Sequence, residues 1–283
     1  MVTQQPSSLQ AFIQRHPVPI YYVLTYALSW GVILLVIGPE GFLGTKAIPE
    51  ARLPLVYLAM LVGPSIAGIL LTDLVSGRRG LYDLLSRMLR WRVGVRWYAV
   101  ALLTAPLLIT AILLALSLAS SAFLPAIITS TDRVSLLVSG IVAGLMVGFF
   151  EELGWTGFAV PELRKRYGLL ATGLIMGLLW GAWHFPLFWA GARSSGELPS
   201  VFLLLVLLFS FLPPYRVLMV CVYDRTKGLP VVVLMHAPLV ASQMILIPVL
   251  AGMSVVTYDL LFATTLWVVV AAVWLRSRYS RKR

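Results

Sequence analysis

The sequence has few charged residues and almost no cysteine. Aspartate, glutamate, lysine and arginine make up 12% of the 283 residues, about half of what a soluble domain of this length carries. The single cysteine, Cys221, excludes a disulfide framework and a cysteine-based zinc ribbon. Hydrophobic side chains, by contrast, make up 60% of the chain, and its mean hydropathy is +0.92. Because there is too little polar surface to face water on all sides, the sequence predicts an integral membrane protein.

The charge that remains is strongly basic, with 22 lysines and arginines against 11 aspartates and glutamates. A net charge of +11 could indicate nucleic-acid binding, but the positive residues come in short blocks between apolar runs. Such blocks mark the cytoplasmic side of a membrane protein and its contact with anionic lipid. The pattern therefore predicts the lipid bilayer, and no nucleic acid, as the partner of these residues.

Eight apolar segments are long enough, or nearly so, to cross the hydrocarbon core, which takes about 20 residues of helix. All are expected to be helices, because backbone amides in lipid must be satisfied within their own segment. The predicted spans are 20–37, 53–75, 97–119, 136–163, 169–190, 201–223, 229–250 and 256–275. The predicted fold class is therefore an all-α, polytopic transmembrane helix bundle, with kinks at its internal prolines.

The basic residues also predict how the bundle lies in the membrane. With eight spans, seventeen lysines and arginines fall on the side of the two termini and four on the other. Under the positive-inside rule both termini are expected in the cytoplasm. The chain then divides into a cytoplasmic N-terminal segment (1–19), the bundle (20–275) and a basic cytoplasmic tail (276–283). No removable signal peptide is expected, and the predicted location is the inner or plasma membrane of the cell.

Four ionisable residues lie inside predicted spans, namely Glu151, Glu152, His184 and His236. At the bilayer centre a charged residue costs about 2.5 kcal/mol or more, so those that persist usually face the bundle interior and serve a function. Only three histidines are present in the whole chain, and two of them are embedded in this way. These four residues are the candidate catalytic site.

Glycines repeat at every fourth residue on the two spans that lead to Glu151 and His184. Such stripes let helix backbones approach closely, so each predicts that the ionisable residue at its end faces a neighbouring helix rather than lipid. The stripes are Gly140, Gly144 and Gly148 on the fourth span and Gly173, Gly177 and Gly181 on the fifth.

A carboxylate and two imidazoles gathered in a dry cavity can hydrolyse a peptide bond. In this interpretation Glu151 takes a proton from water with help from His184, and His236 donates a hydrogen bond to the oxyanion. The same set of Glu151, His184 and His236 could instead hold a zinc ion with an open position for water, since two histidines and a glutamate form a known catalytic ligand set. The residues do not choose between zinc and no metal.

The sequence around these residues resembles three motifs of the CPBP intramembrane proteases, a family that includes CAAX prenyl endopeptidases and bacteriocin-processing or bacteriocin-immunity proteins. The run that begins Glu151-Glu152 resembles EExxxR, the run that ends at His184 resembles FxxxH, and the run that begins at His236 resembles HxxxN. The resemblance covers about residues 134–245. It implies an endopeptidase, usually regarded as a metalloprotease, that cleaves a membrane-associated peptide or protein with these glutamates and histidines.

Three positions depart from those motifs. Thr156 stands where the first has arginine, Trp180 where the second has phenylalanine, and Val240 where the third often has asparagine. Tryptophan keeps an aromatic wall, but the other two changes remove a fixed charge and a possible oxyanion donor. Arg216, inside the sixth span, is the predicted replacement for the charge, and Gln243, on the seventh, for the donor.

Two other functions stay open. A catalytically silent immunity or scaffold protein of the same fold would keep the bundle and lose the chemistry, as the departures at positions 156 and 240 suggest. A proton-coupled transporter could use glutamate and histidine as a relay, but transporters more often show inverted repeats, and none is visible here. Each histidine could also do no more than bond a carbonyl of a neighbouring helix, and Glu152 could serve only to hold Arg216.

Overall fold

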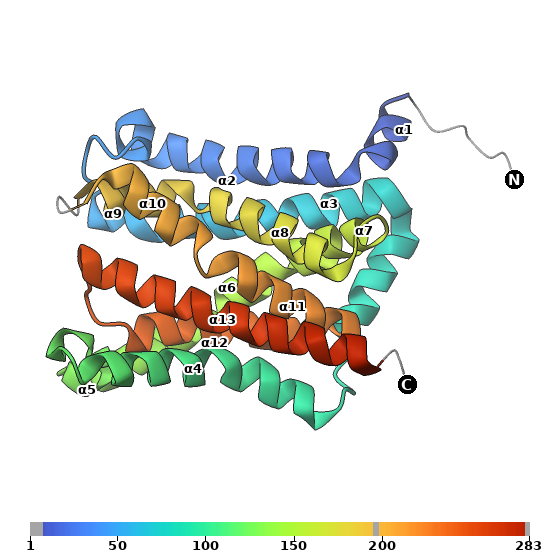
Figure 1. Cartoon of the computed structure of the whole chain (residues 1–283). Helices are drawn as coiled ribbons and strands as arrows, with labels where there is room; N and C mark the ends of the chain where they lie inside the picture. Colours follow the sequence, from blue (N-terminus) through green and yellow to red (C-terminus); the bar gives the residue numbers. More distant parts are fainter. Residues whose placement is uncertain (1–7, 195–197, 281–283) are drawn as a thin grey trace, which may run out of the picture.

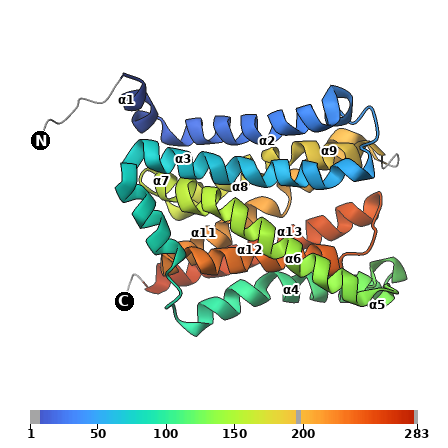
Figure 2. The ribbon, with the colours of Figure 1, turned by 180° about the vertical axis from the view of Figure 1, so that it is seen from behind.

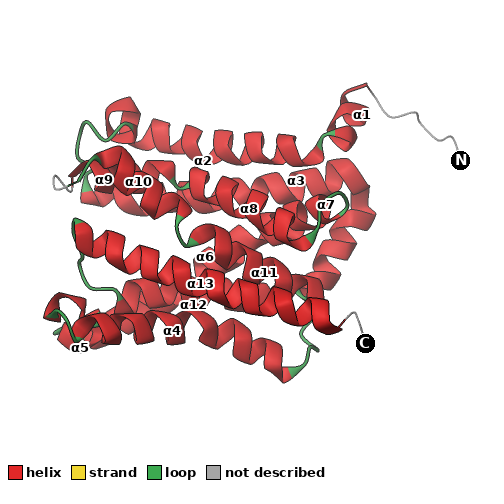
Figure 3. Ribbon diagram, in the orientation of Figure 1, coloured by secondary structure: helices red, strands yellow, loops and turns green. Residues whose placement is uncertain are grey.

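The structure is a computed structural model that describes residues 8–194 and 198–280. Every regular element in this part of the chain is a helix, and it contains no strand (Figure 3). The long helices run side by side along one direction and form a bundle (Figures 1 and 2). The prediction of an all-α, polytopic helix bundle is confirmed.

The elements follow one another with short connections. In chain order they are α1 (Ser8–Arg15), α2 (Pro17–Phe42), the 3-10 turn η1 (Glu50–Arg52), α3 (Leu53–Met88), α4 (Val95–Ser117), the 3-10 turn η2 (Ser121–Phe123), α5 (Ala126–Thr129), α6 (Arg133–Gly154), the π-helical turn η3 (Trp155–Ala159), α7 (Val160–Arg164), α8 (Leu169–Trp183), α9 (Phe185–Ser194), α10 (Ser200–Phe209), α11 (Leu212–Thr226), α12 (Leu229–Leu246) and α13 (Met253–Ser280).

Seven helical segments within the described residues are long and apolar enough to cross a membrane. These are Pro17–Phe42, Glu50–Met88, Val95–Ser117, Arg133–Arg164, Ser200–Thr226, Leu229–Leu246 and Met253–Arg276. Each corresponds to a predicted span. The remaining predicted span, 169–190, is divided at His184 into α8, which has 15 residues, and α9, which has 10. The described part of the chain thus has seven candidate spans instead of the predicted eight because one predicted span is broken into two short helices.

Proline accounts for the positions of two breaks. Pro186 has no N–H to donate to the preceding turn, and the chain leaves α8 two residues before it. Pro213 and Pro214 lie in the first turn of α11, which follows the non-helical Ser210 and Phe211. Other predicted kink sites, such as Pro64 in the middle of α3, lie inside helices that continue through them.

The basic stretch after the second predicted span is more ordered than the sequence indicates. At Gly77 the backbone turns with φ of 60°, a conformation that favours glycine, and α3 then continues to Met88 in a new direction. Arg87 anchors this extension, because its Nη1 donates to the carbonyl of Gly157 at 3.0 Å and to the hydroxyl of Tyr223 at 2.9 Å. The extension therefore packs across the end of the bundle instead of forming a loop.

Basic segments that are far apart in sequence gather at one end of the bundle. Figure 1 shows α1, α7 and the C-terminal end of α13 at that end. Arg166 donates to the carbonyl of Arg15 at 3.2 Å, and Arg164, Arg225 and Arg276 line two neighbouring hollows. This clustering agrees with the prediction that most lysines and arginines lie on the same side of the bundle as the two termini. The side of the membrane that this end faces stays a prediction.

Both glycine stripes face neighbouring helices, as predicted. A methyl group added to Gly144 on α6 would lie 2.4 Å from the carbonyl oxygen of Ala237 on α12. One added to Gly177 on α8 would lie 2.4 Å from the Cα atom of Pro213 on α11. The obstructing atoms belong to the backbone, which cannot move aside as a flexible side chain can. Close helix packing therefore brings α6 against α12 and α8 against α11.

We expect Gly144→Ala to lower the stability of the purified protein, because the added methyl must separate α6 from α12. The expected loss is about 1–3 kcal/mol, as for other overpacked sites. Gly31→Ala is the matched control, since no atom lies within 4 Å of a methyl group at that position on α2. Thermal unfolding in detergent measures both, and equal midpoints for the two variants would contradict the close-packing account.

Candidate functional site

The two adjacent glutamates lie at the end of α6, where the helix changes its hydrogen-bonding pattern. The N–H of Trp155 contacts the carbonyls of Glu151 and Glu152, and Trp155–Ala159 form the π-helical turn η3. Such turns occur mostly as single-turn insertions in α-helices and frequently at functional sites. The wider turn continues the fourth span past the glutamates, so both carboxylates lie within the bundle rather than at its end.

Glu152 is fully buried and accepts hydrogen bonds from three side chains. Arg216 of α11 places Nη1 at 2.8 and 2.9 Å from the two carboxylate oxygens, and Nδ1 of His236 on α12 lies 2.8 Å from Oε1. The hydroxyl of Thr156 donates to Oε2. A buried carboxylate is stable only when it is paired and hydrogen-bonded, and here both requirements are met from three different elements.

Glu151 has a different environment, although it is also buried, with 3% of its surface exposed. Its Oε2 accepts two indole hydrogen bonds, from Trp155 at 3.1 Å and from Trp180 at 2.8 Å. No ion pair with Glu151 is found among the described residues. The two neighbouring carboxylates are therefore held by different chemistry, Glu152 by a cation and Glu151 by neutral donors.

Trp180 lies at the centre of the candidate site. The guanidinium carbon of Arg216 is 4.2 Å from the centre of its ring system, and the rings of His236 and His184 pack edge-on at 5.2 and 5.4 Å. Since its indole nitrogen also reaches Glu151, Trp180 contacts residues from all three motifs. The structure thus brings Glu151, His184 and His236 around one aromatic side chain, and Glu152 is bonded to His236 and Arg216 beside them.

The hydrogen bonds of the two histidines fix which ring nitrogen carries the proton. Nδ1 of His184 lies 2.8 Å from the carbonyl of Trp180, and Nδ1 of His236 lies against the carboxylate of Glu152. Both partners are acceptors, so Nδ1 is the donor in each ring and Nε2 remains for other partners. His236 is buried, whereas His184, at the break between α8 and α9, is partly exposed.

The predicted replacement for the missing motif arginine is confirmed in its placement. Arg216 pairs with Glu152, and Thr156, at the position of that arginine, contacts the same carboxylate through its hydroxyl. The predicted replacement for the missing asparagine has no such support. In the described part of the chain the side chain of Gln243 forms no hydrogen bond with a site residue, and Val240 supplies no donor.

The arrangement does not fit a bound metal ion. Among residues 8–194 and 198–280 no group of three or more His, Cys, Asp or Glu side chains is placed to hold one. Nδ1 of His236 and the Glu152 carboxylate satisfy each other, and Oε2 of Glu151 is occupied by two indoles. The set Glu151, His184 and His236 is therefore not assembled as metal ligands.

An aromatic layer that the sequence did not predict covers the carboxylates. Tyr21 and Tyr22 of α2 pack against Trp155 with ring centres 5.4 and 5.7 Å apart, and Trp183 packs against the same ring at 5.5 Å. All four are buried. The tyrosines lie far from the motifs in sequence, and only their repeat with Tyr26 on one face of the first span could have indicated a packed surface.

We expect Arg216→Ala to reduce stability by about 3–5 kcal/mol, because it leaves the carboxylate of Glu152 buried without a cation. Thr156→Arg should recover part of that loss in the Arg216→Ala background, since it returns a guanidinium to the same carboxylate from one helical turn away. In the wild-type background Thr156→Arg should destabilise, because it adds an unpaired buried cation.

Unfolding in detergent measures this cycle, with Arg92→Ala as the control at an exposed arginine. Additive effects of the two substitutions would show that Arg216 and position 156 do not serve the same carboxylate.

Comparison with known proteins agrees with this site. Residues 133–242 match the family model described as Type II CAAX prenyl endopeptidase Rce1-like. Over 180 residues the chain is 27% identical to CAAX prenyl protease 2 of Methanococcus maripaludis, a match that covers 61% of this chain. The chain spans 65% of the length of that relative. Together with the order and spacing of the three motifs, these matches support the resemblance of the chain to the CPBP family of intramembrane proteases.

Proposed function

We propose that the protein is an intramembrane endopeptidase in which Glu151 activates water for attack on a peptide bond. The observation that carries this proposal is the different bonding of the two adjacent glutamates. Glu152 is neutralised by Arg216 and bonded through both oxygens, so it is unsuited to exchange protons. Glu151 is bonded through Oε2 alone in the described part of the chain, which leaves Oε1 for a water molecule.

In the proposed reaction Oε1 of Glu151 accepts a proton from water, and the resulting hydroxide attacks the carbonyl carbon of the scissile bond. The carbonyl oxygen becomes the oxyanion. When the intermediate collapses, the proton on Glu151 passes to the departing amine, so the general base of the first step is the general acid of the second. The indole donors Trp155 and Trp180 hold Oε2 in place through both steps.

The two histidines have different tasks in this proposal. His236 can donate from a protonated Nε2 to the oxyanion, because the carboxylate of Glu152 at Nδ1 stabilises the positive charge on the ring. His184 presents Nε2 as an acceptor that orients the water beside Glu151. His184 is the least buried of the four site residues, so its side of the site is the proposed approach for substrate and water.

The proposed substrate is a membrane-associated peptide or protein. The relative from Methanococcus maripaludis is named as a CAAX prenyl protease, and for this reason a prenylated C-terminal peptide is the first substrate to test. A catalytically silent protein of the same fold is the second candidate. It is favoured by one observation, namely that Val240 has no side-chain donor and that Gln243 forms no hydrogen bond with a site residue in the described part of the chain.

We expect Glu151→Gln to lower the cleavage rate at least 100-fold, since positioned acid–base groups contribute about 10²–10⁴-fold. The assay reconstitutes the full chain in lipid with a prenylated, membrane-anchored peptide and follows its hydrolysis with and without a chelator. Glu162→Gln, at the edge of the bundle, is the matched control. Equal cleavage by Glu151→Gln and wild type would refute the proposed base, and no cleavage by wild type of any anchored peptide would favour the silent scaffold.

Glu151 and Glu152 should also differ in what their loss does to folding. We expect Glu152→Gln to lower stability by about 3–5 kcal/mol, because Arg216 is left unpaired, and activity should fall with it. Glu151→Gln should retain both indole hydrogen bonds through its carbonyl oxygen and unfold within about 1 kcal/mol of wild type. Thermal and denaturant unfolding in detergent measure both variants, and the reverse order of stability would contradict the assigned roles.

A further inference from the structure

Two neighbouring hollows lie on the face of α11 that is turned away from the candidate active site. Their volumes are about 580 and 780 Å³, and they share four lining residues: Leu218, Cys221, Arg225 and Val273. Helical spacing places residues 218, 221 and 225 on the side of α11 opposite Arg216. The hollows are therefore separate from the site around Glu152.

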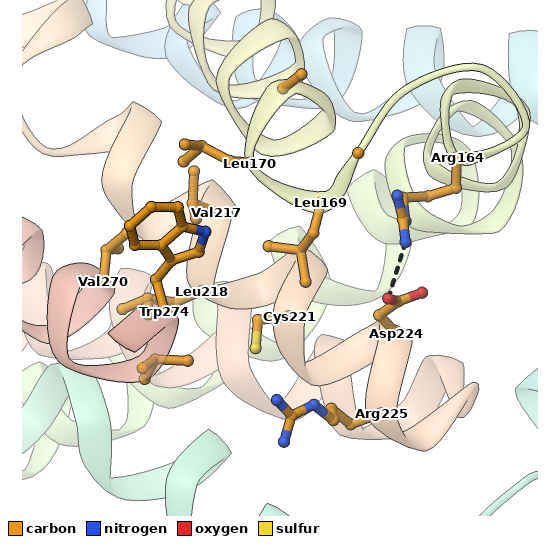
Figure 4. Close-up of a pocket in the computed structure, with 13 residues that line it drawn as sticks. Arg164, Leu169, Leu170, Val217, Leu218, Cys221, Asp224, Arg225, Val270 and Trp274 are labelled. Carbon is orange, nitrogen blue, oxygen red and sulfur yellow. Dashed lines mark hydrogen bonds and ion pairs between the residues drawn. The ribbon is translucent and has the colours of Figure 1, made fainter. Parts of the chain in front are cut away.

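The walls of both hollows are mostly apolar. Leu169 and Leu170 of α8 line the first hollow together with Val217 and Trp274 (Figure 4). The second hollow is lined from α4, α11, α12 and α13; its apolar residues are Trp97, Val100, Leu218, Val222, Met235, Val269 and Val273. Apolar walls of this kind suit hydrocarbon chains better than a polar or charged ligand.

Positive charge lies where the two hollows meet. Arg225 lines both of them, and Arg276 lines the second. The carboxylate that is present, Asp224, is already bonded by Arg164 at 3.0 Å and Lys227 at 2.6 Å. Figure 4 shows Arg225 apart from the Arg164–Asp224 pair. In the described residues no carboxylate lies within ion-pair distance of Arg225 or Arg276, so this region has an excess of positive charge.

The position along the bundle suits a lipid headgroup. Arg225 and Arg276 are exposed, and they belong to the end of the bundle at which the basic segments gather. The apolar walls continue from that end along α11 and α13, toward the middle of the bundle. Basic pockets between membrane helices at the cytoplasmic surface are known to take anionic lipid headgroups.

We propose that the two hollows bind one anionic phospholipid. Its phosphate is bound by Arg225 and Arg276, and its two acyl chains lie on either side of Arg225, one in each hollow. Two apolar channels that meet at a shared cation match the shape of a two-chain lipid with one anionic headgroup. The site holds α8 and α13 against α11 at the end of the bundle, independently of the cleavage reaction.

The test measures lipid retained by the full chain in detergent, by native mass spectrometry after addition of phosphatidylglycerol or phosphatidylcholine. Wild type should retain phosphatidylglycerol in preference to phosphatidylcholine. Arg225→Gln should weaken phosphatidylglycerol binding about fivefold, the equivalent of about 1 kcal/mol per basic residue near the surface, and addition of Arg276→Gln should weaken it further. Arg79→Gln, at an exposed arginine outside the hollows, is the control and should leave binding unchanged.

Two further experiments distinguish a bound phospholipid from other occupants of the hollows. Val273→Trp should reduce phosphatidylglycerol binding by filling the shared wall while both arginines remain, and inorganic phosphate should not displace the lipid. Equal weakening by Arg225→Gln and Arg79→Gln, equal retention of the two lipids, or displacement by free phosphate would overturn the proposal. A dimer that disappears in Arg225→Gln would instead assign the surface to a second copy of the chain.

Discussion

Three helices of the bundle meet at the carboxylate of Glu152. It belongs to α6, the guanidinium that pairs with it comes from α11, and the imidazole that donates to it comes from α12. None of these charges could remain in an apolar interior alone, because burial of a single unpaired ion costs several kcal/mol. The fold can therefore keep Arg216 and Glu152 inside only while α6, α11 and α12 hold their present positions.

Glycine makes that meeting possible. Side chains reach across at 2.8 Å because the backbones of α6 and α12 approach as closely as Gly144 permits, and α8 approaches α11 in the same way at Gly177. The second contact places Trp180 between the charged cluster and Glu151. Packing thus gives the two neighbouring glutamates different partners. Because of this difference, Glu152 can stabilise the fold while Glu151 is available for the proposed chemistry.

Much of this arrangement could be predicted from the sequence. Apolar runs of sufficient length located the helices, and the four-residue glycine repeats indicated which faces pack. The contact of Arg216 with Glu152 was expected as one alternative, since Arg216 was the predicted replacement for the missing motif arginine. Each of these predictions rests on a constraint that acts along one helix or on any buried charge, so no knowledge of the three-dimensional arrangement was needed.

The remainder depended on contacts between distant segments. The helix after Gly77 is fixed by the bonds of Arg87 to a remote turn. The role of Trp180 could not be predicted because it depends on contacts of α8 with α6 and α11. From the sequence alone, an aromatic residue in an apolar span indicates only packing. For Gln243, helical spacing from His236 predicts the correct face of α12, but in the described part of the chain its side chain forms no hydrogen bond with a site residue.

The most direct test of the buried cluster is the protonation state of His236 in the folded protein. The chain has only three histidines, so ¹⁵N-labelled histidine gives few signals that single substitutions can assign. The account predicts that His236 carries a slowly exchanging proton on Nδ1 and that Glu152→Gln shifts this signal while His16 is unaffected. A His236 ring that averages between tautomers as a solvent-exposed one does, unchanged by Glu152→Gln, would contradict it.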